Sequence, residues 1–179
     1  DLIVRFYDPV DGIIKVDGID IKKYSLDQLR SSISYVPQNA FLFSETIEKN
    51  IGYGLISSIL KDIVEASKKA VVHKNIVSFL DGYQTILGER GVTLSGGQIQ
   101  RVSIARAIIK NSKILLLDDC LSAVDTNTEK EILNHLKSFT KSKTTIIVSH
   151  RISSLKHADQ IIVFENGQIV QQGKHTDLM

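Results

Sequence analysis

The sequence predicts an α/β fold with a mainly parallel sheet as its core and a helical subdomain inserted into that core. Apolar runs at 33–36, 114–117 and 145–148 have the length of strands, and stretches with helical periodicity separate them. Alternation of this kind favours parallel strands. Residues from about 40 to 110 are mostly helical in pattern, and we expect them to form the inserted subdomain of a single domain spanning 1–179.

Local signals place the individual elements. Asp17-Gly18 lies between two short apolar runs and predicts a tight hairpin turn, while Ser25 with Gln28 three residues later predicts a capped helix start. The runs at 114–117 and 145–148 are continuously apolar, so we expect both strands to be buried on two faces. In chain order the expected elements are strands at 13–16, 19–21 and 33–36, helices at 58–72, 75–80 and 97–110, a strand at 114–117, a helix at 126–139, a strand at 145–148, a helix at 153–157, and a closing hairpin at 161–171.

The start of the chain has the pattern of a helix that is already under way. The first residue is Asp1, and the apolar stretch 2–4 follows at once. No signal peptide is visible, and no apolar run reaches the ~20 residues that cross a bilayer. We therefore interpret the sequence as a fragment that lacks its N-terminal region.

Composition excludes several classes of function. The 179 residues suit one globular domain, with 42% hydrophobic and 23% charged residues. A net charge of +2 gives no electrostatic argument for nucleic acid or for an anionic membrane, so no nucleic-acid partner is expected. Cys120 is the single cysteine, which points to a reducing compartment, and a catalytic thiol is the less favoured alternative for it.

The first candidate site is Ser95-Gly96-Gly97-Gln98, which precedes a strongly patterned helix. Adjacent glycines allow close approach to the backbone, and a helix start presents free N–H groups that favour an anion such as a phosphate. A Gly-rich turn that only caps a helix has the same appearance. Taken alone, the short motif fits that simpler alternative better.

The second candidate site is the pair Asp118-Asp119, which ends the apolar run 114–117. Ligands of open α/β sheets bind beyond the carboxyl ends of the strands. One carboxylate there can hold Mg²⁺ beside nucleotide phosphates, and the next can orient or deprotonate an attacking water. A solvated strand end, or a helix cap at Asp119, is the alternative.

Two more polar residues follow strands. His150 follows the run 145–148, with Ser149 between them, and it can contact a terminal phosphate. Gln38 follows the strand 33–36 and can contact Mg²⁺ or the attacking water. Either residue alone is also compatible with a purely structural role.

The order and spacing of these motifs resemble the nucleotide-binding domains of the ABC ATPase family over nearly the whole chain. The resemblance implies a P-loop NTPase-like fold, ATP and Mg²⁺ as cofactors, and a phosphate-binding loop (Walker A) only a few residues before Asp1. Matching motifs imply that Gln38 is the Q-loop residue near Mg²⁺ and the attacking water, and that Asp118 is the Walker B ligand of Mg²⁺. They imply that Asp119 is the catalytic base and His150 the switch histidine. The signature that contacts ATP would be Ser95, Gly96, Gly97 and Gln98, and Asp125 would be a D-loop contact to nucleotide.

Further segments are similar to exporter-type members of that family. These segments are 5–9, 12–18, 41–47 and 88–91. Segment 41–47 would face a coupling helix of the membrane domain, and segment 88–91 resembles the X-loop. The resemblance implies a transmembrane domain on the same polypeptide and a second nucleotide-binding domain in a head-to-tail dimer. It places the domain at the cytoplasmic face of the cell membrane, where ATP hydrolysis powers export.

One departure from the family pattern concerns Asp119, because the family usually has Glu at this position. The carboxylate is one methylene shorter, and so the site is expected to hydrolyse ATP slowly. An intact signature beside a weakened base suggests an asymmetric heterodimer; a slow homodimer is the alternative.

Three functions compete on these observations. The first is the ATPase domain of a membrane exporter, the second a regulatory nucleotide-binding half with negligible hydrolysis. The third is a soluble ABC ATPase in DNA maintenance or translation. Segments 41–47 and 88–91 and the lack of basic excess argue against the third.

Overall fold

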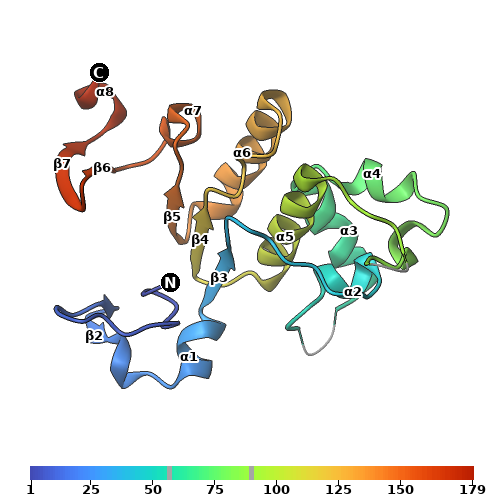
Figure 1. The fold of residues 1–179 in the computed structure, drawn as a ribbon, viewed down its shortest axis with the longest axis horizontal. Helices are drawn as coiled ribbons and strands as arrows, with labels where there is room; N and C mark the ends of the chain where they lie inside the picture. The colour runs from blue at the N-terminus through green and yellow to red at the C-terminus, as the bar shows by residue number, and fades with distance from the viewer. Residues whose placement is uncertain (56–57, 89–90) are drawn as a thin grey trace.

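The computed structural model describes residues 1–55, 58–88 and 91–179. A parallel sheet lies at the centre of the molecule (Figure 1). Its strands are β3 (Ile33–Val36), β4 (Ile114–Asp118) and β5 (Thr144–Val148), in the order β3-β4-β5. Ile33 pairs with Ile114, and Leu117 with Ile147. All three strands therefore end at the same edge, which confirms the parallel core predicted from the sequence.

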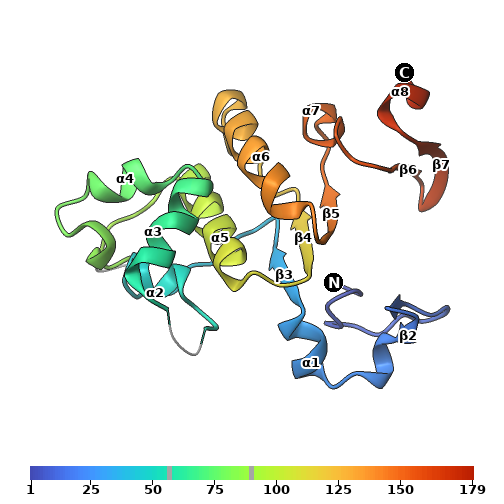
Figure 2. The same cartoon turned by 180° about the vertical axis from the view of Figure 1, so that it is seen from behind.

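Helices that lie between β3 and β4 in the sequence gather at one end of the molecule (Figures 1 and 2). The longest is α5, whose last turn leads into β4 through Asn111 in the left-handed conformation (φ 54°). The elements of this group are α2 (Ile47–Ile51), α3 (Leu60–Lys69), α4 (His73–Val77), the 3-10 helix η2 (Gly82–Gln84) and α5 (Gly96–Lys110). Of these, α2 and η2 were not expected from the sequence.

The N-terminal region forms a small hairpin beside the sheet. Strands β1 (Lys15–Val16) and β2 (Ile19–Asp20) are joined by Asp17 and Gly18, both with positive φ (51° and 77°), as a type I′ turn requires. The 3-10 helix η1 (Ile21–Lys23) and α1 (Leu26–Ser31) lead to β3.

One local prediction for this region is confirmed, because Ser25 and Gln28 form the predicted capping box of α1. Residues 2–5 form a turn, in which Phe6 N–H donates to Asp1 O and Arg5 N–H to Leu2 O. The helix expected at the start of the chain therefore stays a prediction.

The C-terminal region continues from β4 through a helix to the far end of the molecule, opposite the helical group (Figures 1 and 2). It comprises α6 (Thr126–Thr140), β5, α7 (Ile152–Leu155), β6 (Ile161–Glu165), β7 (Gln168–Gly173) and α8 (His175–Leu178). The hairpin β6–β7 turns at Asn166-Gly167, both with positive φ, as its sequence predicts. Within the described ranges, no helix is long and apolar enough to cross a bilayer.

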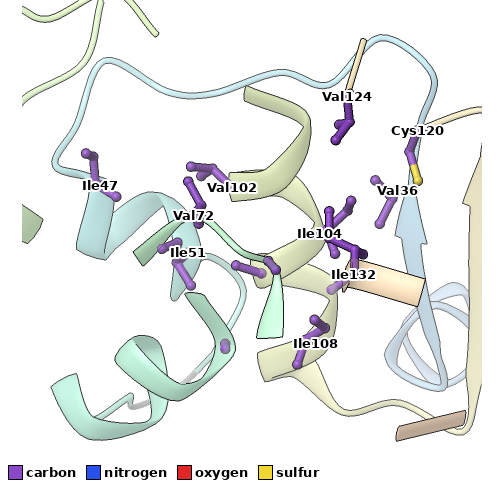
Figure 3. Packing of buried hydrophobic residues seen from close by; sticks show 14 of the residues in the cluster. Val36, Ile47, Ile51, Val72, Val102, Ile104, Ile108, Cys120, Val124 and Ile132 are labelled. Atoms are coloured by element: carbon purple, nitrogen blue, oxygen red, sulfur yellow. The ribbon is translucent and has the colours of Figure 1, made fainter. Parts of the chain in front are cut away.

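The main core lies between α5, the other helices and β4. Figure 3 shows Ile104 and Ile108 of α5 facing Ile132 of α6 and Val36 of β3. Ile104 and Ile132 are 1% and 0% exposed. Burial of this extent stabilises each such side chain by roughly 1.5–3 kcal/mol. A smaller cluster around Leu29 and Leu116 joins the N-terminal region to the sheet.

The expected burial of β5 on both faces is wrong. Leu115 and Leu117 of β4 are 1% and 2% exposed, but Ile146 and Val148 of β5 are 39% and 55% exposed. Among the described residues β5 pairs only with β4, so its other edge carries no strand. A groove of about 840 Å³ lies along this side, between β5, α6, α7 and β6.

Candidate functional site

The carboxyl edge of the sheet brings together four of the residues that the sequence singles out. Asp118 is the last residue of β4, and the hydroxyl of Tyr35 in β3 donates to its Oδ2 atom at 3.3 Å. Burial raises the pKa of Tyr35, and the negative charge of Asp118 raises it further. Tyr35 therefore stays a protonated donor that orients the Asp118 carboxylate.

Asp119 is the centre of this cluster. Its Oδ2 atom accepts a hydrogen bond from Gln38 Nε2 at 3.3 Å, and its Oδ1 atom lies 3.0 Å from His150 Nδ1. Its own N–H donates to Val148 O at 2.8 Å, which ties the turn after β4 to the end of β5. The side chain of Asp119 is 16% exposed, whereas that of His150 is 66% exposed and open to a ligand.

The backbone at Asp119 explains how two neighbouring carboxylates serve separate partners. Asp119 has φ 46°, in the left-handed region that costs a non-glycine residue about 1 kcal/mol or more. The turn directs the Asp119 carboxylate toward Gln38 and His150, while the Asp118 carboxylate meets Tyr35. Strain of this kind is typical of functional sites.

The donor set fits Mg²⁺ that is held mainly through water and phosphate. Asp118 and the Gln38 side chain offer oxygen ligands at one edge, the type of ligand that Mg²⁺ prefers. Across the residues with assigned positions, no group of three or more His, Cys, Asp and Glu side chains forms a complete metal cage. One or two protein ligands beside substrate phosphates are usual for Mg²⁺ in nucleotide sites.

The signature residues form the start of α5. Ser95 is the N-cap: its Oγ atom accepts from Gln98 N–H, and its own N–H donates to Gln98 Oε1 at 2.9 Å. The first intrahelical bond runs from Ile99 N–H to Ser95 O. The N–H groups of Gly96 and Gly97 thus remain for an anion, because the first N–H groups of a helix have no partner within it.

The start of α5 packs closely on the segment 122–125. A Cβ atom at Gly97 would lie 2.8 Å from Ala123 O, so only glycine fits there without a shift. The buried Gln100 side chain accepts from Ala123 N–H at 3.1 Å and donates to Ser122 Oγ at 3.4 Å. The signature and the segment after Asp119 are therefore one packed unit.

Asp125 has a structural partner in this chain. Its Oδ1 atom accepts from the N–H groups of Asn127 and Thr128 and so caps α6. The hydrogen bond from the Thr128 backbone is the main cause of the lowered pKa of the Asp125 carboxyl. The capping role seen here does not test the nucleotide contact expected for Asp125.

Sequence reasoning missed the polar residues that hold the cluster in place. Arg151 follows His150 and forms an ion pair with Glu129 of α6, with 2.6 Å between Nη1 and Oε2. Glu129 is 1% exposed. A buried Glu on an otherwise amphipathic helix is the signal that could have revealed the pair, because such a residue is almost never fully buried without a partner.

Aromatic side chains mark the expected exporter segment 41–47. The Phe43 ring lies 5.2 Å from Phe41 and 4.4 Å from Tyr53, and Arg106 of α5 stands over Phe43 and Tyr53. Phe41 and Tyr53 are 66% and 58% exposed. The cluster is an exposed aromatic surface fixed to the signature helix.

Two other expectations concern Cys120 and the X-loop. Burial raises the pKa of the Cys120 thiol to about 12, which leaves it protonated and unsuited to nucleophilic attack. The catalytic thiol alternative thus has no support. The X-loop expected at 88–91 includes Glu89 and Arg90, which lie outside the described residues.

Comparison with known proteins gives one consistent result. The ABC transporter family profile matches residues 1–122. An uncharacterized ABC transporter ATP-binding protein, YknU of Bacillus subtilis, is 53% identical over 99% of the chain, and a putative multidrug export ATP-binding/permease protein, YgaD of the same bacterium, is 48% identical. The solved structure of a bacterial Atm1-family ABC exporter with ATP bound is 42% identical, with a TM-score of 0.94 over 99% of the chain. The chain spans 30–31% of the length of these proteins.

Proposed function

The chain belongs to the ABC transporter family, and from that premise we propose that it binds and hydrolyses ATP to power export across a membrane. The observation that carries this proposal is the double contact of Asp119 with Gln38 and His150 at the carboxyl edge of the sheet. These three side chains come from the ends of three neighbouring strands. Water and a terminal phosphate would meet beside them, because ligands of such sheets bind beyond the carboxyl ends of the strands.

The proposed reaction is attack of water on the terminal phosphate of ATP. Asp119 orients this water and accepts its proton, while Gln38 holds the carboxylate from the opposite side. In the tautomer with the proton on Nδ1, His150 donates to Asp119. The ring would then meet the phosphate through Nε2, which donates to it only when this nitrogen also carries a proton.

Asp118 and Gln38 are the residues that would hold Mg²⁺. The ion, when bound, neutralises charge that develops on the phosphate oxygens. Tyr35 keeps the Asp118 carboxylate in place through its 3.3 Å hydrogen bond. Among the residues of this chain, Tyr35 and Gln38 thus orient the two carboxylates for different tasks.

The proposed assembly is a head-to-tail dimer of two nucleotide-binding domains. Ser95, Gly96, Gly97 and Gln98 would contact ATP held by the opposite domain, with Asp125 close to the same interface. The free N–H groups at the start of α5 support this role. Residues from about 40 to 110 would form the helical subdomain that carries the signature.

The proposed second partner is a transmembrane domain on the same polypeptide. Its coupling helix would lie on the exposed aromatic surface of Phe41, Phe43 and Tyr53. One relative, YgaD, is described as both ATP-binding protein and permease. The ATPase domain would then lie at the cytoplasmic face of the membrane.

An ATPase assay on the full-length protein, with and without its membrane domain, tests the proposal. We expect hydrolysis that depends on Mg²⁺ and changes when the membrane domain is removed. Hydrolysis that is indifferent to the membrane domain would instead favour a soluble ABC ATPase. Absence of hydrolysis in both preparations would contradict the proposal.

The second candidate function is a weakened, regulatory half of a heterodimer. The observation in its favour is Asp119 itself, whose carboxylate is one methylene shorter than that of Glu. A displacement near 1 Å can cost ~10²-fold in rate. The contacts of Asp119 with both neighbours support the working base instead, and substitution of Asp119 separates the two.

A further inference from the structure

The segment 121–124 connects Asp119 to α6 and contains no helix or strand. Leu121 and Val124 bury their side chains in the main core, and Ser122 Oγ donates to Asp119 O at 3.0 Å. Leu121 O accepts from Val124 N–H within the segment at 3.1 Å, but Ser122 O and Val124 O find their partners outside it. Its position is therefore set in part by side chains that reach it from other elements.

Arg151 supplies most of these contacts. Its Nη2 atom donates to Ser122 O at 2.8 Å, and its Nη1 atom to Val124 O at 3.1 Å and to Leu121 O at 3.4 Å. The planar guanidinium group presents several N–H groups in a fixed geometry, which lysine cannot reproduce. A single side chain next to His150 thereby holds three carbonyls of the segment.

Glu129 of α6 fixes the position of Arg151. Its Oε2 atom accepts from Arg151 at 2.6 Å, and its Oε1 atom accepts from Ser153 at 3.1 Å and from Ser154 at 2.6 Å. The carboxylate thus holds Arg151 and the first turn of α7 together. His150, which immediately precedes Arg151, is anchored on the same unit.

Gln100 reaches the segment from the opposite side. It accepts from Ala123 N–H and donates to Ser122 Oγ, and it belongs to the helix that begins with the signature. The segment 121–124 therefore has Arg151 on the side of His150 and Gln100 on the side of Ser95. A continuous set of polar contacts runs from the catalytic edge to the start of α5.

We propose that Arg151 is a positioning residue that locks the segment 121–124 to the histidine turn, so that His150, Asp119 and the start of α5 move as one unit. This inference rests on the proposed function and deepens it. A displacement of His150 by the phosphate would shift Arg151, and with it the segment that Gln100 joins to α5. Binding of ATP at the chain's own site would thus change the position of the signature residues, which would contact ATP held by the opposite domain.

The first test compares Arg151→Lys with Arg30→Lys in the full-length transporter. Arg30 is a matched control, because it also donates to carbonyls of another segment, Val4 O and Arg5 O, but lies outside the site. We expect Arg151→Lys to lower kcat about tenfold or more, with KM for ATP within about twofold of wild type. Arg30→Lys is expected to leave both constants within about twofold.

The second test measures hydrogen exchange of backbone amides in the same proteins. In Arg151→Lys, amides in 121–125 should exchange faster, while amides in 102–108 of α5 keep their protection. A kcat equal to that of the control, together with unchanged exchange in 121–125, would overturn the inference. Loss of protection throughout α5 would also overturn it, since it would show general unfolding.

The two tests separate this inference from the proposed function. If the wild-type transporter hydrolyses no ATP, the proposed function fails, and exchange alone decides the role of Arg151. Unchanged exchange in that case rejects the lock, and faster exchange confined to 121–125 supports it.

Discussion

The two sides of the central sheet are held in different ways. On the side of β3 and β4, apolar side chains fill the space to the helices, and Ile47, Ile51 and Ile104 are 0%, 0% and 1% exposed (Figure 3). On the side of β5, Ile146 and Phe164 are 39% and 65% exposed. The residues that follow β5 are instead joined to α6 by polar contacts of Glu129.

The two kinds of support position different residues of the candidate site. Asp118 belongs to β4, so apolar packing on the side of β3 and β4 fixes its position. His150 follows the half-exposed strand β5, so the partly buried ion pair Arg151–Glu129 does for it what apolar packing does for Asp118. The candidate catalytic edge lies where the two kinds of support meet.

Truncation of apolar side chains should expose the difference most strongly. Ile104→Ala leaves a cavity in the packed side and should lower the free energy of unfolding by about 2–5 kcal/mol. Ile146→Ala, in the half-exposed strand β5, should cost less than about 1.5 kcal/mol. Thermal unfolding of the intact protein measures both changes in the free energy of unfolding. Equal losses would show that the two sides of the sheet do not differ in packing.

Removal of the Glu129 charge tests the polar support. Glu129→Gln weakens charge-assisted hydrogen bonds from Arg151 and two serines, and should lower the free energy of unfolding by about 1.5–3 kcal/mol. Glu131→Gln is the control, since Glu131 lies exposed on the same helix. Equal melting temperatures of the two variants would show that the pair is dispensable.

The same carboxylate should make stability depend on pH. Burial acts to raise the pKa of Glu129, but hydrogen bonds from Ser154, Arg151 and Ser153 outweigh burial, and the pKa lies below its usual 4.5. Stabilisation from a lowered pKa is complete above the unfolded value and is lost as pH falls through the folded value. Below pH 4.5 wild type should thus lose its advantage in melting temperature over Glu129→Gln. A constant difference across this range would contradict the assignment.

Two neighbouring glycines give the smallest and sharpest contrast. Gly96→Ala places its Cβ atom 3.8 Å from Ala123 Cβ and should stabilise the helix by up to about 1 kcal/mol. Gly97→Ala would bring its Cβ atom to 2.8 Å from Ala123 O and should destabilise the protein instead. Melting temperatures that shift in the same direction would show that the contact to Ala123 is unimportant.

The sequence was informative where a local pattern decides the structure. The cap at Ser25, the turn at Asp17-Gly18 and the strand 114–117 follow from neighbouring residues, and all are confirmed. The burial of 145–148 was predicted wrongly, because burial depends on what lies beside a strand. Its composition could not reveal the exposed edge.

The candidate site shows the same division. The motif order identified Gln38, Asp118, Asp119 and His150, and the structure brings them to one edge. The contact between Arg151 and Glu129 joins residues 22 apart, and the strand β5 lies between them. The place of Glu129 on an amphipathic helix indicates that it needs a partner, but no local pattern identifies Arg151 as that partner, so only the fold could reveal it.

We propose that Asp119 is the working base of an ATPase site, and ATP hydrolysis by Asp119→Asn in the full-length transporter tests this claim. The amide keeps the size of the side chain but cannot accept the proton, so we expect kcat to fall about 10²-fold or more. Ser95→Ala serves as the companion variant, because Ser95 would act on the opposite site. Near wild-type hydrolysis by Asp119→Asn, together with loss of most activity in Ser95→Ala, would contradict the claim and assign hydrolysis to a partner domain.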